Sequence, residues 1–192
     1  MGKRYWLVAL VALFAFVGIQ AQDSPWQVSI LPGYQFSSSE VDSGFVMSLD
    51  GTYFWQENFG LHAAWLYNEG KFKLGVPPYG DVKFSKSFSI LEVGPEWDWR
   101  AGADGKIYLQ LNVGHTFGAG SFSEIQTVKV GNSLYIVNVQ GSLDNEWTYG
   151  AAFGYRYHFN KKTAMVVQGA YHRINNWDTD HWDIRVGVAF RF

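Results

Sequence analysis

The sequence contains no cysteine, no apolar run long enough for a transmembrane helix and no strong net charge. The absence of Cys from its 192 residues excludes a disulfide scaffold and a thiolate metal site. A mean hydropathy of −0.11 excludes a bundle of transmembrane helices. A formal net charge of −2 argues against nucleic acid as a partner. The chain is therefore weakly acidic and has the length of a single domain.

The first 21 residues have the pattern of a secretory signal peptide. Lys3 and Arg4 form a basic start, residues 7–19 form an apolar core, and Ala21 is the small residue at the cleavage site. The core is shorter than the roughly 20 residues that a spanning helix needs. We therefore expect a cleaved signal peptide over 1–21 and a mature domain over 22–192, with an uncleaved anchor as the alternative. No Cys follows the cut, so a lipoprotein is not expected.

Aromatic residues are abundant, at 18% of the chain, and they follow a period of two. The last segment, WDIRVGVAFRF, has apolar residues at every second position from Trp182 to Phe192, with charged or small residues between them. Period two is typical of a strand with two different faces. The last strand of a soluble β-sandwich is the alternative interpretation of this segment taken alone.

Seven earlier segments share the alternation, so the sequence predicts eight strands. A tilted strand of about 9–11 residues spans a bilayer. The connections are short at one end, whereas two at the other end are much longer, Glu69 to Phe88 and Gly118 to Glu146, as in outer-membrane barrels. At Pro32 a bulge or a ladder break is expected. The predicted strands are Trp26–Phe36, Phe45–Tyr53, Phe59–Tyr67, Ser89–Trp99, Ile107–Phe117, Trp147–Phe159, Ala164–Ile174 and Trp182–Phe192.

The two faces of these strands indicate which solvent surrounds them. One face is apolar along its length, whereas the other carries Asp, Glu, His, Arg, Asn and Gln. A sheet crosses a bilayer only as a closed barrel, and aromatic residues cluster at both strand ends, as interfacial girdles do. A soluble lipocalin-type barrel, the alternative, would hold these charges in its hydrophobic cavity. The sequence thus predicts an all-β, eight-stranded antiparallel up-and-down transmembrane β-barrel.

With its signal, strand count, loop asymmetry and terminal Phe192, the chain resembles the small eight-stranded outer-membrane β-barrels of the OmpA/OmpX-like and porin families. The resemblance implies a place in the outer membrane of a Gram-negative bacterium, in contact with outer-membrane lipid and lipopolysaccharide. It also implies that the C-terminal strand is recognised by the barrel-assembly machinery. The residues of that signal are Ile184, Val186, Val188, Phe190 and Phe192. Such a family does not imply a single activity.

The inward-facing charges predict a mixed-charge cluster inside the barrel. Glu96 and Arg156 are at similar depths near the turn end, and both point into a narrow interior. Eight strands enclose a space that side chains just fill, so we expect a plugged lumen and a structural or surface-interaction role. A small-solute pore is the alternative. A second layer nearer the loops is expected from Glu92, Asp183, Arg185 and His172.

Enzymatic activity, metals and cofactors are not expected. None of the five His residues lies in a metal-binding motif such as HExxH. Some eight-stranded barrels modify lipid A with a His, a Ser or an acidic group near the outer leaflet. A lipid A-modifying enzyme is therefore a further, less favoured alternative, but the segment YHRINNWDTDHWD lacks a Ser nucleophile. Its candidate groups are His172, His181, Asp178 and Asp180.

The connection between the fifth and sixth predicted strands is rich in strand-forming residues. Gly131-Asn132 lies among them, and this pair tolerates the positive φ of a tight turn. We expect both strands to continue beyond the bilayer as a protruding hairpin, from about Ser121 to Gln140. An exposed strand edge is a template for strand addition. The 121–140 hairpin is thus the candidate surface for another protein or a host molecule, and packing over the barrel mouth is the alternative.

Overall fold

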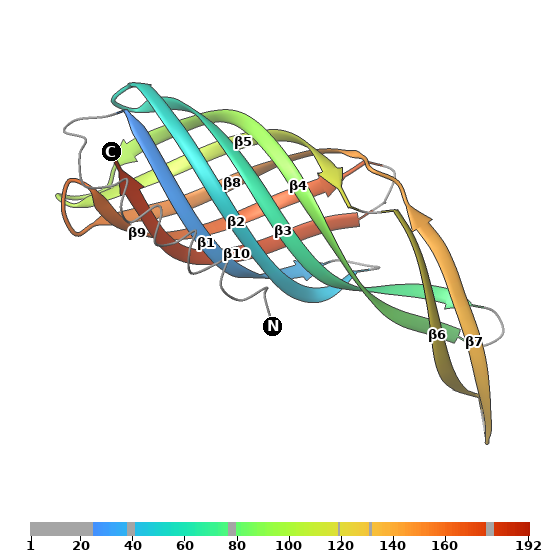
Figure 1. Cartoon of the computed structure of the whole chain (residues 1–192). Helices are drawn as coiled ribbons and strands as arrows, with labels where there is room; N and C mark the ends of the chain where they lie inside the picture. The colour runs from blue at the N-terminus through green and yellow to red at the C-terminus, as the bar shows by residue number, and fades with distance from the viewer. Residues whose placement is uncertain (1–24, 38–40, 77–79, 119, 131, 176–178) are drawn as a thin grey trace, which may run out of the picture.

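The structure, a computed structural model, describes residues 25–37, 41–76, 80–118, 120–130, 132–175 and 179–192. Eight of the strands in these ranges form a closed barrel, and two form a separate hairpin (Figure 1). No helix in the described ranges is long and apolar enough to cross a membrane. The predicted signal peptide, 1–21, lies outside them. The strands are β1 Trp26–Ser37, β2 Val41–Gln56, β3 Phe59–Val76, β4 Gly80–Arg100, β5 Gly105–Phe117, β6 Gly120–Val130, β7 Ser133–Leu143, β8 Trp147–His158, β9 Thr163–Ile174 and β10 Thr179–Arg191.

The barrel closes because its last strand pairs with its first. Val28 of β1 lies opposite Phe190 of β10, and the strand order around the barrel is β1-β10-β9-β8-β5-β4-β3-β2. Every neighbouring pair is antiparallel. Closure leaves no open strand edge within the barrel wall itself. The predicted eight-stranded up-and-down barrel is confirmed.

Pro32 interrupts one ladder without changing the register. The β1–β10 pairing resumes in the same register after it skips Leu31 and Pro32, from Ile30–Val188 to Gly33–Arg185. On the other side, β1 pairs with β2 without a gap. Because Pro has no N–H group to donate, an interruption on one side is the expected result. Of the two predicted outcomes, the ladder break is present and the bulge is not.

Alternate residues of the barrel strands point inward and outward. On β10, Asp183 and Arg185 are buried, whereas Ile184 and Val186 are exposed on the outside. The same alternation of buried and exposed residues runs along β8 and β9. The inner positions include the polar residues Arg156, Gln168 and His172 and the apolar residues Val166 and Ile174. The outer positions are mostly aromatic or aliphatic, with Arg173 as a charged exception near the loop end of β9. The barrel therefore has a polar interior and an apolar exterior, the inverse of a soluble barrel and the arrangement that lipid requires.

The connection from Glu69 to Phe88 was predicted as a loop, and this prediction is wrong. β3 and β4 pair without interruption out to Val76–Gly80, beyond the points where β2 and β5 leave them. The two strands therefore form a long hairpin that extends past the barrel rim (Figure 1). The period-two alternation continues in this segment, where Phe72 and Leu74 alternate with Lys residues.

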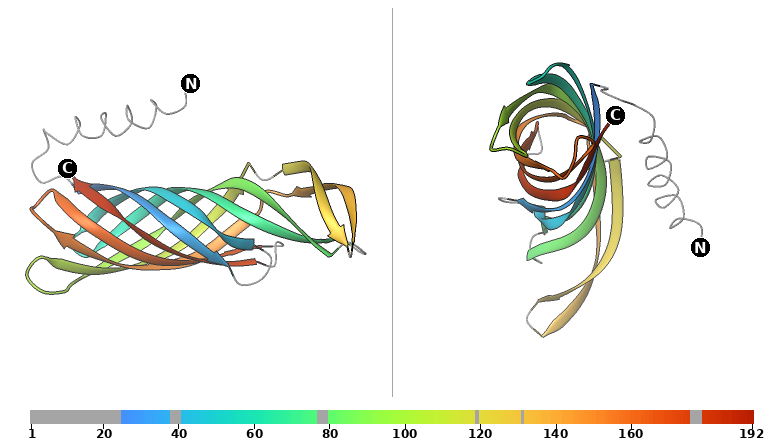
Figure 2. Two further views of the ribbon diagram at one scale, coloured as in Figure 1. Left: turned by 90° about the horizontal axis from the view of Figure 1, so that it is seen from below. Right: turned by 90° about the vertical axis from the view of Figure 1, so that its left-hand side faces the viewer.

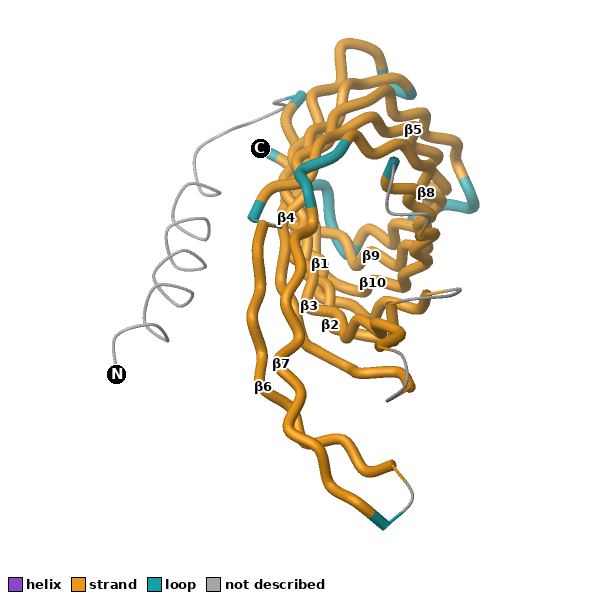
Figure 3. Tube along the Cα trace, turned by 90° about the vertical axis from the view of Figure 1, so that its right-hand side faces the viewer, coloured by secondary structure: helices purple, strands orange, loops and turns teal. Residues whose placement is uncertain are grey.

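The predicted hairpin between the fifth and sixth barrel strands is present, but it does not continue those strands. β6 and β7 form their own two-stranded sheet from Gly120–Leu143 to Val130–Ser133. Of the predicted Gly131-Asn132 turn, Gly131 lies outside the described residues. Gly118 has a φ of 77°, which a residue with a side chain rarely adopts. This residue redirects the chain between β5 and β6. The hairpin projects from the same end of the barrel as the β3–β4 extension (Figure 3).

The opposite end of the barrel holds the three short turns, the start of β1 and the end of β10 (Figure 2). In outer-membrane barrels the short turns face the periplasm and the long connections face the exterior. In a barrel of that kind, the β6–β7 hairpin and the β3–β4 extension would lie on the outer side of the membrane.

Candidate functional site

Arg156 of β8 organises the charged layer nearer the turns. Its Nη2 lies 2.7 Å from Oε1 of Glu96, and its Nη1 lies 2.7 Å from Oδ1 of Asp98. Its Cζ lies 3.8 Å from the centroid of the Tyr108 ring. All four side chains are buried. The guanidinium is thus held by two carboxylates and an aromatic face, which keeps a buried cation paired.

The backbone alternation and register explain why these groups meet. Glu96 and Asp98 are two residues apart on β4 and therefore share its inner face. Asp98 pairs with Tyr108 of β5, and Tyr108 pairs with Gly154 of β8. A Cβ atom placed on Gly154 would lie 2.3 Å from the Cζ of Tyr108. The glycine therefore makes room for the ring that lies against Arg156.

Hydrogen bonds extend this layer across the barrel interior. Oε2 of Glu96 accepts a hydrogen bond from Nε2 of Gln110 at 2.6 Å and another from Oγ1 of Thr52 at 3.1 Å. Nε2 of Gln168 donates to Oε1 of Gln110 at 2.8 Å. These bonds connect β2, β4, β5 and β9, so the layer fills the interior from several sides.

A second layer lies nearer the loops. Nε of Arg185 donates to Oδ1 of Asp183 at 2.6 Å. The His172 ring lies 3.4 Å from Asp183 Oδ2 and 3.3 Å from Glu92 Oε2. Nδ2 of Asn112 donates to Oε1 of Glu92 at 3.0 Å. His172 therefore lies between the two carboxylates and links β4, β9 and β10.

The structure thus places the five sequence-predicted cluster residues in two layers. Glu96 meets Arg156 and Asp183 meets Arg185, whereas Glu92 contacts His172 instead of an Arg. Sequence reasoning omitted Asp98 and Tyr108 from the cluster, although both alternate onto inner faces. Which inner residues face each other across a barrel depends on its shear, which single-strand patterns do not contain.

The groups considered for lipid A chemistry are not assembled into one site. His181 faces the interior, where its Nδ1 lies 2.7 Å from Nε2 of Gln35. Asp180 instead accepts a hydrogen bond from the Tyr171 hydroxyl at 2.9 Å and lies 3.7 Å from Arg173. Asp178 lies outside the described residues. Within the described ranges, no three His, Cys, Asp or Glu side chains are grouped to hold a metal ion.

Comparisons with known proteins agree with this architecture. The family model described as "Outer membrane protein beta-barrel domain" matches residues 7–192. The chain belongs to this family. It is therefore a β-barrel protein of the Gram-negative outer membrane, with a polar and charged interior network. No curated protein matches its sequence.

Solved structures of other outer-membrane barrels have a similar fold. Neisserial surface protein A is 13% identical, with a TM-score of 0.60 over 88% of this chain and 98% of that one. OprG from Pseudomonas aeruginosa is 14% identical, with a TM-score of 0.60 over 91% and 99%. The N-terminal barrel of OprF from the same organism is 13% identical, with a TM-score of 0.51 over 89% and 100%. At such low identity the likeness shows the shared fold alone.

Proposed function

We propose that this outer-membrane barrel is a non-enzymatic surface-interaction protein that presents the β6–β7 hairpin to another protein. The observation that carries the proposal is the exposure of three large aliphatic side chains outside the barrel. Ile125, Leu134 and Ile136 are 71%, 70% and 79% exposed. Exposed apolar patches of this kind are typical of interaction surfaces. Here they lie on a hairpin that begins beyond the barrel rim and extends to one side of the barrel (Figure 3).

The backbone of the hairpin supports the same role. In the described sheets, β6 and β7 pair only with each other, so each strand has an open edge. An open edge offers N–H and C=O groups to an added strand. Strand addition supplies main-chain hydrogen bonds, and exposed side chains such as Ile125 and Ile136 add apolar contact.

The test compares adhesion of expressing cells to one another and to immobilised extracellular protein. Ile136→Pro removes an N–H group from β7 and should abolish adhesion. Ile136→Val retains a β-branched apolar residue and should preserve most of it. Protease cleavage of intact cells within 121–140, with amide-exchange protection of both arms, would verify an exposed and paired hairpin. Equal adhesion by cells with and without the protein would contradict the proposal.

A plugged lumen fits this role better than a pore. The two charged layers lie across an interior that eight strands leave only wide enough for side chains. Planar-bilayer recordings should therefore detect little conductance. A large, stable conductance in the unmodified protein would favour the pore alternative.

Lipid A acylation in expressing cells should be unchanged, and an altered pattern would favour the enzyme alternative.

We also infer that the C-terminal strand directs assembly through the barrel-assembly machinery. Ile184, Val186 and Val188 form an apolar outer row on β10, and this strand must pair with β1 to close the barrel. The N–H of Phe192 donates to the carbonyl oxygen of Trp26 at 3.0 Å. The outer row, which continues to Phe190 and Phe192, would also contact outer-membrane lipid and lipopolysaccharide.

Deletion of Phe192 should lower the amount of folded barrel in the outer membrane while secretion continues. Heat-modifiable migration on gels measures the folded fraction, and Phe192→Tyr, which keeps an aromatic end, is the matched control. Unchanged folded levels after the deletion would make the terminal residue dispensable.

The signal peptide has its own test. If it is cleaved after Ala21, N-terminal sequencing of the membrane form should give Gln22 as the first residue.

A further inference from the structure

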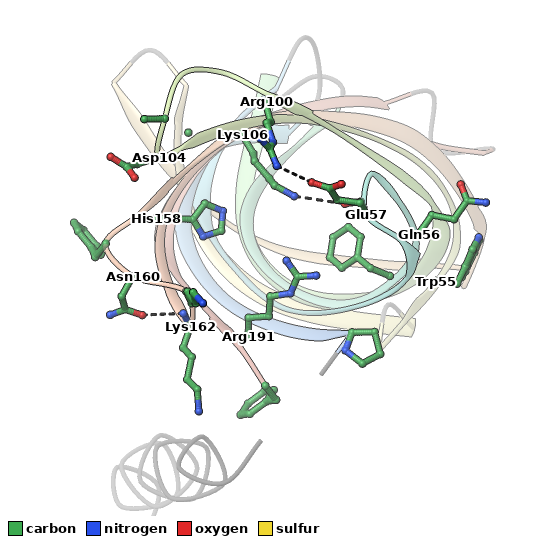
Figure 4. Close-up of a pocket in the computed structure, with 17 residues that line it drawn as sticks. Trp55, Gln56, Glu57, Arg100, Asp104, Lys106, His158, Asn160, Lys162 and Arg191 are labelled. Atoms are coloured by element: carbon green, nitrogen blue, oxygen red, sulfur yellow. Dashed lines mark hydrogen bonds and ion pairs between the residues drawn. The ribbon is translucent and has the colours of Figure 1, made fainter. Parts of the chain in front are cut away.

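A cavity of about 1120 Å³ opens at the turn end of the barrel, and we name it the vestibule (Figure 4). Its walls are the β2–β3, β4–β5 and β8–β9 turns together with the start of β1 and the end of β10. The formal net charge of the whole chain is −2, yet cationic residues predominate here. The charged lining side chains are Arg100, Lys106, Lys161, Lys162 and Arg191 on the basic side, and Glu57 and Asp104 on the acidic side; Phe192, which carries the α-carboxylate, also lines the cavity.

The two acidic side chains do little to neutralise the middle of the vestibule. Oε1 of Glu57 lies 3.0 Å from Nη2 of Arg100 at the rim. Asp104 points away from the opening (Figure 4). Lys106 points inward, with its Nζ 3.4 Å from Asp98 Oδ2 and 3.5 Å from the Glu57 carbonyl oxygen. One of the inward cations is thus already paired.

Arg191 and His158 are not paired in this way. The guanidinium of Arg191 extends into the opening, with its Cζ 5.4 Å from the centroid of the Phe54 ring (Figure 4). Among the described residues, no carboxylate lies within salt-bridge distance of it. His158 points into the same space, and its buried Nε2 has no hydrogen-bond partner in the described part of the chain. This nitrogen therefore has no partner among the described residues and is available to a water molecule or a ligand in the vestibule.

A planar guanidinium, an imidazole and an ammonium that converge on one space are the groups that recognise oxyanions. We propose that the vestibule binds a small oxyanion of the phosphate or carboxylate type. Arg191 supplies the bidentate contact, and His158 and Lys106 supply further donors. The site faces the periplasm and is independent of the role proposed for the β6–β7 hairpin.

The test is calorimetric titration of inorganic pyrophosphate into the folded barrel in zwitterionic detergent. The wild type should bind one equivalent saturably. Arg191→Gln should weaken binding by about tenfold or more, equivalent to about 1.4 kcal/mol. Lys162→Gln is the matched control, because Lys162 lines the vestibule but its side chain points out of the barrel (Figure 4). This control should change the affinity by less than about twofold, as expected of a solvent-exposed charge.

His158 provides a second readout. Its imidazole resonances should shift on addition of pyrophosphate, and His158→Gln should weaken binding while heat-modifiable migration verifies that the barrel is folded. No saturable binding by the wild type would overturn the proposal. An equal loss of pyrophosphate affinity in Arg191→Gln and Lys162→Gln would also overturn the proposal, because it would indicate non-specific charge attraction.

Two nanodisc compositions distinguish the sources of the oxyanion. If a phospholipid headgroup occupies the vestibule, phosphatidylglycerol should compete with pyrophosphate, and Arg191→Gln should abolish the competition. If the ligand is a soluble solute, the affinity for pyrophosphate should be the same in phosphatidylglycerol and phosphatidylcholine nanodiscs. Either result supports an oxyanion site, and the two results distinguish a phospholipid headgroup from a soluble solute as the ligand.

Discussion

Arg156 in the barrel interior and Arg191 in the vestibule are the same residue type in opposite settings. Arg156 has carboxylate oxygens 2.7 Å away on two sides. Arg191 lies near a phenyl ring and has no carboxylate partner among the described residues. A buried charge must be paired for the fold to be stable, whereas a charge at a solvent-accessible opening can remain unpaired and available to a ligand. The interior layer thus supports the barrel, and the vestibule is suited to binding.

The largest expected effect comes from breaking the interior pair. Arg156→Ala should lower the free energy of unfolding by about 3–5 kcal/mol, because it leaves the buried carboxylates of Glu96 and Asp98 without their cation. Glu96→Ala should lower it by less, because Asp98 still pairs with Arg156. Denaturant titration of the barrel in micelles, followed by tryptophan fluorescence, measures the change. The double variant should lose less free energy of unfolding than the two single variants lose together. If neither Glu96→Ala nor Arg156→Ala changes the free energy of unfolding, the charged layer around Arg156 is hydrated rather than tightly paired.

A smaller effect is expected where the interior is crowded rather than charged. Gly154→Ala places a methyl group against the Tyr108 ring, which lies under Arg156. Overpacking of this kind destabilises by about 1–3 kcal/mol, and the same denaturant titration measures it. Gly169→Ala is the matched control, because a Cβ at Gly169 has its nearest neighbour at 4.0 Å. Equal stability of the two variants would show that Tyr108 has room to move.

The smallest effect is expected at the rim of the vestibule. Glu57 and Arg100 form an ion pair at 3.0 Å, but their side chains are 66% and 77% exposed. Glu57→Ala should therefore change the free energy of unfolding by no more than about 1 kcal/mol. A loss as large as that of Glu96→Ala would contradict the distinction between a structural interior and a solvent-accessible rim.

Local patterns were sufficient for much of the fold. Alternation along each strand identified all eight barrel strands and their inner and outer faces, because the side chains of a strand alternate with a period of two. Residues such as Asp183 and Ile184 were assigned to opposite faces on this basis, and the structure agrees. The hairpin around Gly131-Asn132 was also predictable, since a tight turn between strand-forming segments is a local signal.

The tertiary structure decided which distant residues meet. Asp98 and Arg156 are 58 residues apart, and their contact depends on the stagger between β4, β5 and β8. The outward extension of β3 and β4 depends on their mutual pairing, which their separate patterns did not reveal. The vestibule is built from three turns and both barrel ends, so no single segment encodes it. Side-chain direction is a property of one strand, whereas contacts across the barrel depend on how closure sets the shear of all eight.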